Sequence, residues 1–284
     1  MKFVTFINQG KEMPGVISAE GTHVLPLEGW ETLDAFIAGC EGKSPADMIP
    51  SGSGIPLTEV KLTAPIPHPR HDILCIGQNY LAHAIESFEF KGLKYVKPDN
   101  PVYFGKRVNR AVANGEAIPS HSDITKQLDY ENELAIIIGK RCDHVKPEDV
   151  FDHIFGYTIV NDISARDLQY AHVQYAFGKG LDGATPMGPW IVTADEFQSP
   201  PDLRVSTKIN GELRQDSRTS DFIFDIPYII SELSGGIVLE PGDIIITGTP
   251  SGVGMGLKPP CFLVPGDVIE CEIEGIGTLT NPVK

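Results

Sequence analysis

The sequence predicts a β-rich α+β fold, in which a small N-terminal α+β domain is followed by a larger main domain. Two observations predict this class. Short apolar segments recur along the chain between turn residues, and only a few segments have helical periodicity. The 284 residues include 29 glycines and 23 prolines, which favour short strands and sharp turns over long helices. A chain of this length can bury a sizeable core without disulfides.

The N-terminal segment predicts one helix near Trp30–Cys40 and three short strands, at 3–7, 14–18 and 22–26. A polar, glycine-rich stretch follows. Three prolines within Leu62–Arg70 then fix φ and remove backbone donors, which indicates a stiff, extended linker. We therefore place a domain boundary here, between an accessory domain at 1–65 and the main domain at 66–284.

The main domain alternates apolar runs with glycine and proline turns. These runs predict strands at Ile73–Ile76, Leu134–Ile138, Phe155–Val160, Trp190–Val192, Ile244–Ile246 and Val268–Ile273. Helices are predicted at Tyr80–Phe88, Ala165–Tyr175 and Ile226–Leu233. A capping box formed by Ser164 and Asp167 would open the second helix, and Asp225 would cap the third.

The charge balance argues against nucleic-acid and membrane partners. A formal net charge of -15 repels phosphate backbones, and no stretch approaches the ~20 apolar residues of a membrane span. We therefore expect a cytoplasmic protein. Its five cysteines are scattered and include no Cys-x-x-Cys, which argues against a disulfide framework and a zinc site. One group of basic residues is interpreted as a solvated loop: Lys91, Lys94, Lys97, Lys106, Arg107 and Arg110.

Three carboxylates suggest a metal site. Glu131 and Glu133 lie two residues apart at the start of a strand that is apolar from 134 to 138, so their side chains share a face. Two adjacent like charges at a core strand raise one pKa or demand a cation. Asp162 follows the next apolar strand. An oxygen-only set suits Mg²⁺, Mn²⁺ or Ca²⁺ better than zinc. The alternative is a set of solvated carboxylates without a metal.

Two further segments suggest chemistry. His83 and Glu86 stand at i and i+3 on a predicted helix, so the carboxylate can orient the imidazole as a general base. The alternative is a surface pair. Lys179 lies between glycines, where its ammonium could stabilise a developing oxyanion or simply be exposed. The glycine-rich turn at 246–256 lacks both the dinucleotide and the P-loop spacing, so we expect its amides and the Thr249 hydroxyl to meet a small anion.

Taken together, these segments resemble the fumarylacetoacetate hydrolase family over residues 72–282. The matching pieces are Gly77-x-Asn-Tyr-x-x-His-Ala-x-Glu86, Asp129-Tyr-Glu-x-Glu-Leu-Ala135, Asn161-Asp-Ile-Ser-Ala-Arg-Asp-Leu-Gln169, Gly178-Lys179, Pro186-x-Gly-Pro-Trp190, Asn210-Gly-Glu212 and Thr247-Gly-Thr-Pro-x-Gly-Val-Gly254. Each motif is weak, but the ordered set is specific.

The resemblance implies a mixed β-roll-like catalytic domain, assembled as a homodimer, with Mg²⁺ or Mn²⁺ on Glu131, Glu133 and Asp162. It further implies that His83 and Glu86 activate water. Substrate contacts are implied for three residues, Lys179, Gln169 and Thr249. Gln78 also lies near the substrate, at a position where some acylpyruvate-cleaving members have arginine.

The expected reaction is metal-dependent hydrolysis of a C–C bond in a β-diketo acid such as an acylpyruvate, with release of pyruvate or a related 2-keto acid. The alternative uses the same site without water: keto–enol or double-bond isomerisation of a 2-keto diacid, or its decarboxylation. All of these reactions pass through an enolate, so the sequence does not separate them. A different class of function is a metal- or ligand-binding protein without catalysis.

Overall fold

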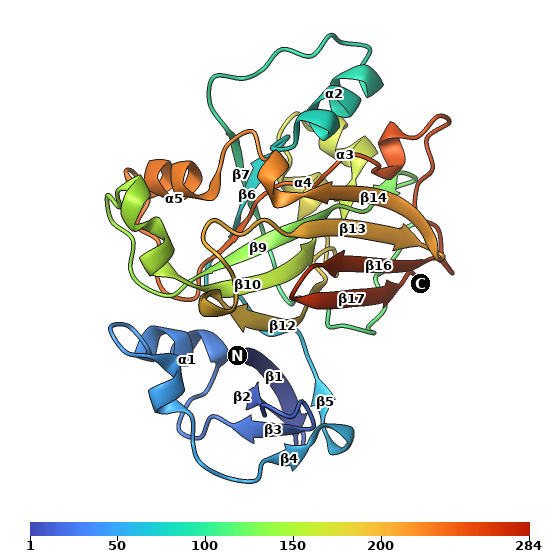
Figure 1. The fold of residues 1–284 in the computed structure, drawn as a ribbon. Coiled ribbons are helices and arrows are strands. Elements are labelled where there is room, and N and C mark those ends of the chain that lie inside the picture. The colour runs from blue at the N-terminus through green and yellow to red at the C-terminus, as the bar shows by residue number, and fades with distance from the viewer.

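The large sheet organises the molecule (Figure 1). The computed structural model describes residues 1–284. The sheet has 11 strands, in the order β4 (Ile55–Pro56), β3 (His23–Pro26), β2 (Lys11–Ile17), β1 (Lys2–Asn8), β12 (Met187–Thr193), β10 (Ile154–Asn161), β9 (Asn132–Ile138), β15 (Ile244–Ile246), β6 (Ile73–Gly77) and β7 (Val102–Lys106), with β5 (Lys61–Leu62) paired to β1. Every pairing is antiparallel except that of β15 with β6. The sheet is therefore mixed.

Two smaller sheets complete the β structure. One has four strands, in the order β14 (Glu212–Arg218), β13 (Arg204–Ile209), β16 (Val268–Ile273) and β17 (Gly277–Pro282). The other pairs β8 (Leu128–Asp129) with β11 (Ser164–Ala165). The helices are short: α1 (Leu33–Gly39), α2 (Leu81–Phe90), α3 (Arg166–Ala171), α4 (Ala176–Lys179) and α5 (Ile226–Ser234). The predicted β-rich α+β class is confirmed.

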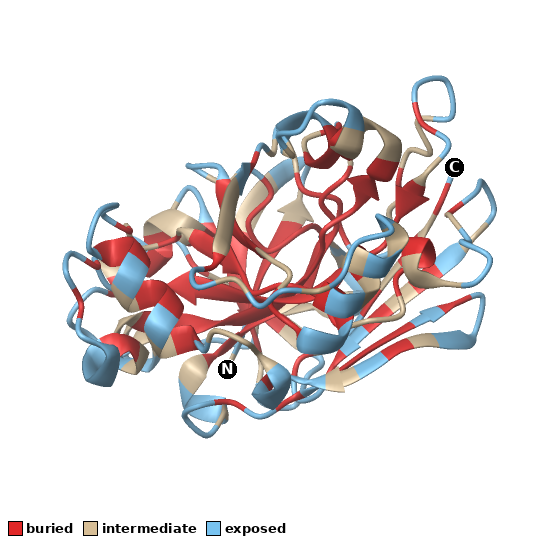
Figure 2. Ribbon diagram, turned by 90° about the horizontal axis from the view of Figure 1, so that it is seen from above, coloured by how far each residue is buried: buried red, intermediate tan, exposed pale blue.

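The core lies on both faces of the central strands (Figure 2). In β9, Leu134, Ile136 and Ile138 belong to one buried cluster. Ala135 and Ile137 belong to the other. Alternating side chains of this strand therefore enter two different clusters, which explains why every position from 134 to 138 is apolar. By the same alternation, the side chains of Glu131 and Glu133 lie on the same face as those of Ala135 and Ile137.

The N-terminal residues form a lobe beside the main body in Figure 1. Its strand β1 joins the large sheet through β12, with Phe3 opposite Ile191. Phe3 packs in the same buried cluster as residues of β9 and β10. The division at residue 65 therefore stays a prediction about domains, because the two parts share a sheet and a core. The helices of the whole chain are all too short or too polar to cross a bilayer.

The helix expected over Ala165–Tyr175 is wrong in extent. Within that range only α3 forms, and α4 begins just after it, because Val173 adopts a left-handed backbone with φ of 62°. The capping box at its start is also wrong. Ser164 is held in strand β11, and its hydroxyl donates to the carbonyl of Asp162 at 2.9 Å instead of capping a helix. Asp167 accepts from the hydroxyl of Thr125.

Candidate functional site

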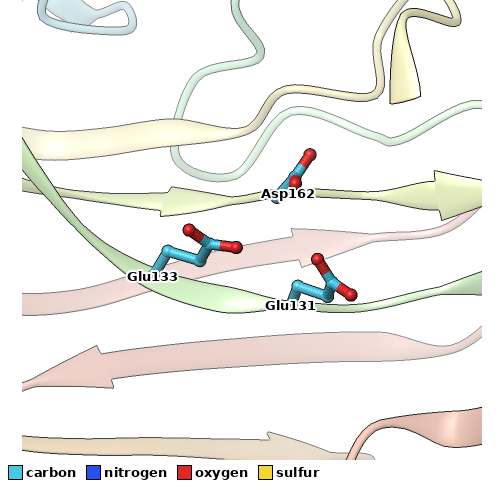
Figure 3. Close-up of side chains that lie close together, drawn as sticks. All are labelled: Glu131, Glu133 and Asp162. Atoms are coloured by element: carbon cyan, nitrogen blue, oxygen red, sulfur yellow. The ribbon is translucent and has the colours of Figure 1, made fainter. Parts of the chain in front are cut away.

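Three buried carboxylates converge next to the central strands (Figure 3). Glu133 lies at the start of β9, Glu131 directly precedes that strand, and Asp162 directly follows the neighbouring strand β10. The register that places Val160 opposite Glu133 brings the third carboxylate beside the other two. One oxygen from each group lies within 4.8 Å of the others, and all three residues are buried. This arrangement is compact enough to share one cation.

Buried cations already meet two of these carboxylates. The Lys179 ammonium lies 2.5 Å from Glu131 Oε2 and 2.5 Å from Asp162 Oδ2. Lys106 lies 2.8 Å from Asp162 Oδ1. It also donates to the carbonyls of Ile163 and Lys179. The solvated-loop interpretation is therefore wrong for Lys106, because pairing with a buried aspartate holds its side chain fully inside the protein.

Glu133 is the carboxylate that lacks a cation. Its hydrogen bond comes from the Gly248 amide, at 2.6 Å. Burial and the charges of Asp162 and Glu131 raise the pKa of Glu133 well above its ordinary value. Glu131 behaves in the opposite way: burial favours its neutral form, yet the charges of Arg166 and Lys179 lower its pKa. A divalent cation at this point would let Glu133 ionise, and the all-oxygen donor set fits Mg²⁺ or Mn²⁺.

The amide that reaches Glu133 depends on a glycine. Gly248 has φ of 91°, which disfavours a side chain. A Cβ at this position would lie 2.9 Å from the Cβ of Asn79 and 3.0 Å from the carbonyl of Ile76. The turn thus brings its backbone close to the carboxylates because no side chain intervenes.

The predicted pair on α2 also forms. His83 Nδ1 lies 3.2 Å from Glu86 Oε2, and His83 is buried. Glu86 also accepts the amide of Gly252, at 3.0 Å. A Cβ on Gly256 would lie 1.8 Å from Glu86 Oε1, so the glycine-rich loop packs directly on this carboxylate. The pair is fixed by the fold and is not a surface contact. With Nδ1 bonded to Glu86, Nε2 is the ring nitrogen left to exchange a proton.

One narrow recess collects most of the predicted site. Its walls include Gln78, His83, Glu131, Glu133, Gln169, Lys179 and Thr249. Asp162 and Glu86 lie behind this wall, where each contacts a residue that does face the recess. The structure therefore brings together all nine residues that the sequence singled out.

The predicted substrate-binding side chains already form hydrogen bonds within the protein, to different extents. The Thr249 hydroxyl donates to the carbonyl of Asn132 at 3.0 Å and accepts from Gln215 at 2.8 Å, so the protein already occupies it. Gln78 donates to the Ser87 hydroxyl at 3.1 Å. Gln169 accepts from Arg166 at 3.3 Å. Contact with a substrate stays a prediction for each of them.

Sequence reasoning missed a buried ion pair that supports the site. Arg166 Nε lies 2.9 Å from Asp129 Oδ2, and Arg166 Nη2 lies 2.6 Å from Glu131 Oε1. Asp129 also accepts the amides of Gly254 and Met255, at 2.6 and 3.1 Å. The pair therefore joins a candidate metal ligand to the loop that holds Glu86. The sequence offered no local signal for this pair, because its two residues lie 37 positions apart and each stands among other polar residues.

Comparison with known proteins now places the chain. The family model described as "Fumarylacetoacetate (FAA) hydrolase C-terminal" matches residues 72–284. The chain belongs to the fumarylacetoacetate hydrolase family. This family is one of enzymes, and the family resemblance inferred from the motifs is confirmed.

Named relatives within the family include more than one reaction type. The chain is 52% identical over 227 residues to the oxaloacetate tautomerase YisK of Bacillus subtilis (strain 168), covering 80% of this chain and 74% of that protein. A solved structure of a fumarylacetoacetate hydrolase from Exiguobacterium antarcticum matches with a TM-score of 0.83 at 42% identity, covering 100% and 99% of the two chains. A 5-carboxymethyl-2-hydroxymuconate delta-isomerase from Mycobacterium smegmatis matches with a TM-score of 0.77 at 33% identity, covering 100% and 99%.

The raised pKa of Glu133 gives a prediction for metal binding. A carboxylate must be ionised to hold a metal, so below this pKa binding should release a proton from Glu133. The apparent affinity for Mg²⁺ or Mn²⁺ should then rise with pH, by up to about tenfold per unit, and level off above the pKa. Calorimetric titration between about pH 5 and 8, in buffers of different ionisation enthalpy, measures both quantities.

The control for this titration is Glu212→Gln, which removes an exposed carboxylate and should change neither proton release nor affinity. Glu133→Gln should weaken binding at every pH. A wild-type affinity that is independent of pH, with no proton released, would show that Glu133 is not a metal ligand.

The Asp129–Arg166 pair gives a prediction for stability. Asp129→Ala removes one of the two carboxylates bound to Arg166 and leaves two buried amides without an acceptor. We therefore expect the free energy of unfolding to fall by about 3–5 kcal/mol. Asp216→Ala breaks an exposed pair with Arg204 and should cost less than about 1 kcal/mol. Urea unfolding compares the two. Equal losses in the two variants would contradict the structural role of the buried pair.

Proposed function

We propose that this protein is a divalent-metal-dependent isomerase that interconverts the keto and enol forms of a small 2-keto dicarboxylic acid of the oxaloacetate type. The observation that carries the proposal is the meeting of His83 with the carboxylate cluster in one recess. This places a proton-transfer group beside a site suited to a Lewis acid. The 52% identity to a tautomerase, together with the match to an isomerase structure, favours isomerisation over hydrolysis.

The proposed metal is Mg²⁺ or Mn²⁺, held by Glu131, Glu133 and Asp162, with Ca²⁺ compatible with the same donors. When bound, it would supply Lewis acidity that withdraws electrons from a 2-keto group and so makes the neighbouring C3–H more acidic. The Lys179 ammonium, which already lies between two of these carboxylates, would stabilise negative charge on the 2-oxygen.

His83 is the proposed proton acceptor. Its Nε2 would take a proton from C3, while Glu86 holds the ring through Nδ1 and stabilises the imidazolium that forms. Protonation of the 2-oxygen then completes the enol. One C–H bond breaks and one O–H bond forms, so the reaction consumes no water and needs no other reactant.

Hydrolysis of a β-diketo acid is the second candidate function. It is favoured by the similarity to a structure named as a fumarylacetoacetate hydrolase. The same His83–Glu86 pair would then take a proton from water instead of from carbon. The two reactions share the metal site and differ in what His83 deprotonates.

The two functions are separated by a paired assay on the Mg²⁺-loaded protein. We expect fast loss of the enol absorbance of oxaloacetate and little release of pyruvate from an acylpyruvate. His83→Asn should lower kcat for tautomerisation about a hundredfold or more, because general acid–base catalysis contributes about 10²–10⁴-fold. His144→Asn changes an exposed histidine outside the recess and serves as the control.

Cleavage of the acylpyruvate without tautomerisation would establish the hydrolase instead. Unchanged kcat in His83→Asn would remove His83 from the mechanism under either function. Metal affinity, measured by calorimetry, should remain at the wild-type level in this variant, since His83 is not among the three carboxylates.

A further inference from the structure

Lys91 is a cation of the recess wall that has no acidic partner. Arg166 and Lys179 also line the recess, but each is bound to two buried carboxylates. Lys91 forms no ion pair and lies exposed at the rim, with its ammonium 5.1 Å from the centre of the Tyr170 ring. The charge of Lys91 is therefore free to meet an anion that enters the recess.

Helix α2 places Lys91 on the same face as His83, toward the recess. His83, Ser87 and Lys91 follow one another at intervals of four residues, and all three line the recess. Residues at this spacing share one face of a helix, and their side chains lean toward its N-terminus. Lys91 stands at the C-cap position, still in the helical backbone region. Eight residues of helix span about 12 Å, and a side chain at this far end that leans toward the N-terminus extends in the direction of His83.

The neighbourhood of Lys91 is built by contacts to α3. Phe90 stacks on Tyr170 with ring centres 5.9 Å apart, which ties the end of α2 to the helix that carries Gln169. Although Lys91 is exposed overall, its partial burial against this wall and the charge of Arg166 lower its pKa. A carboxylate placed beside the ammonium would counteract both effects, because it favours the charged form. By contrast, Lys94 lies on the following loop, is exposed, and does not line the recess.

We propose that Lys91 binds the second carboxylate of the substrate and so makes the site selective for 2-keto dicarboxylic acids over 2-keto monocarboxylic acids. This inference rests on the proposed function, which places the 2-keto end of the substrate at the carboxylate cluster. The other cations near that cluster are neutralised by buried acids, whereas a second carboxylate reaching the rim meets Lys91. A monocarboxylic substrate has no group for this position.

The test uses two non-reacting ligands that differ in that one group. L-Malate is L-lactate with a second carboxylate, and both carry a 2-hydroxy acid end. Calorimetric titration of the Mg²⁺-loaded protein should show that the wild type prefers malate. In Lys91→Met, malate binding should weaken about tenfold or more, since hydrogen bonds to charged groups are the strong ones, while lactate binding is unchanged. Lys91→Arg should restore part of the preference, and Lys94→Met should behave as the wild type.

Steady-state kinetics give a second readout. In Lys91→Met, the KM for oxaloacetate should rise about tenfold with a smaller change in kcat, because the lost contact is made in the ground state as well as in the transition state. The proposal is overturned if the wild type binds malate no more tightly than lactate, or if Lys91→Met weakens both ligands equally. Because the ligand titrations need no turnover, they can succeed even where tautomerisation fails, so the two proposals are judged separately.

Discussion

Four carboxylates are buried against three buried cations beside the central strands, and this imbalance is the constraint on which the site depends. The acids are Asp129, Glu131, Glu133 and Asp162, and the cations are Lys106, Arg166 and Lys179. Burying an unpaired charge costs several kcal/mol, so the spare carboxylate must bind a proton or share a further cation. Glu133 is that carboxylate, because the other three acids each contact a buried cation and it contacts none. The same imbalance explains why the cluster suits a divalent ion and, once one is bound, an anionic substrate.

The ion pairs also connect the chemistry to the fold. Arg166 bridges Glu131 and Asp129, and Asp129 binds the loop whose Gly252 amide holds Glu86. Glu131, a candidate metal ligand, and the His83–Glu86 pair are thus fixed through one chain of buried contacts. Because both ends share this support, a change in the loop should disturb His83 and the carboxylates together. The structure is preorganised for charge stabilisation, which is where most catalytic benefit of such sites arises.

Sequence spacing correctly predicted which side chains share one face of a strand or helix. The spacing of Glu131 and Glu133 placed both on one strand face, and the i, i+3 spacing of His83 and Glu86 placed them on one helix face. Sequence patterns failed to predict a residue's environment where a partner distant in the sequence determines it. Lys106 was interpreted as part of a solvated basic loop, because no residue near it in the sequence indicates its ion pair with Asp162. The break at Val173 and the strand role of Ser164 likewise come from tertiary contacts that override helix signals.

Under the proposed function, helix α2 would combine two tasks in the turnover of a dicarboxylic acid. It carries His83 near the carboxylate cluster and, two turns later, the unpaired Lys91 at the rim. One helix then fixes the distance between the proposed proton acceptor and the proposed anchor for the far carboxylate. A substrate with a second carboxylate would be held with C3 beside His83, whereas a shorter acid would be free to turn. In this proposal, selectivity and proton transfer would both follow from the same helical spacing.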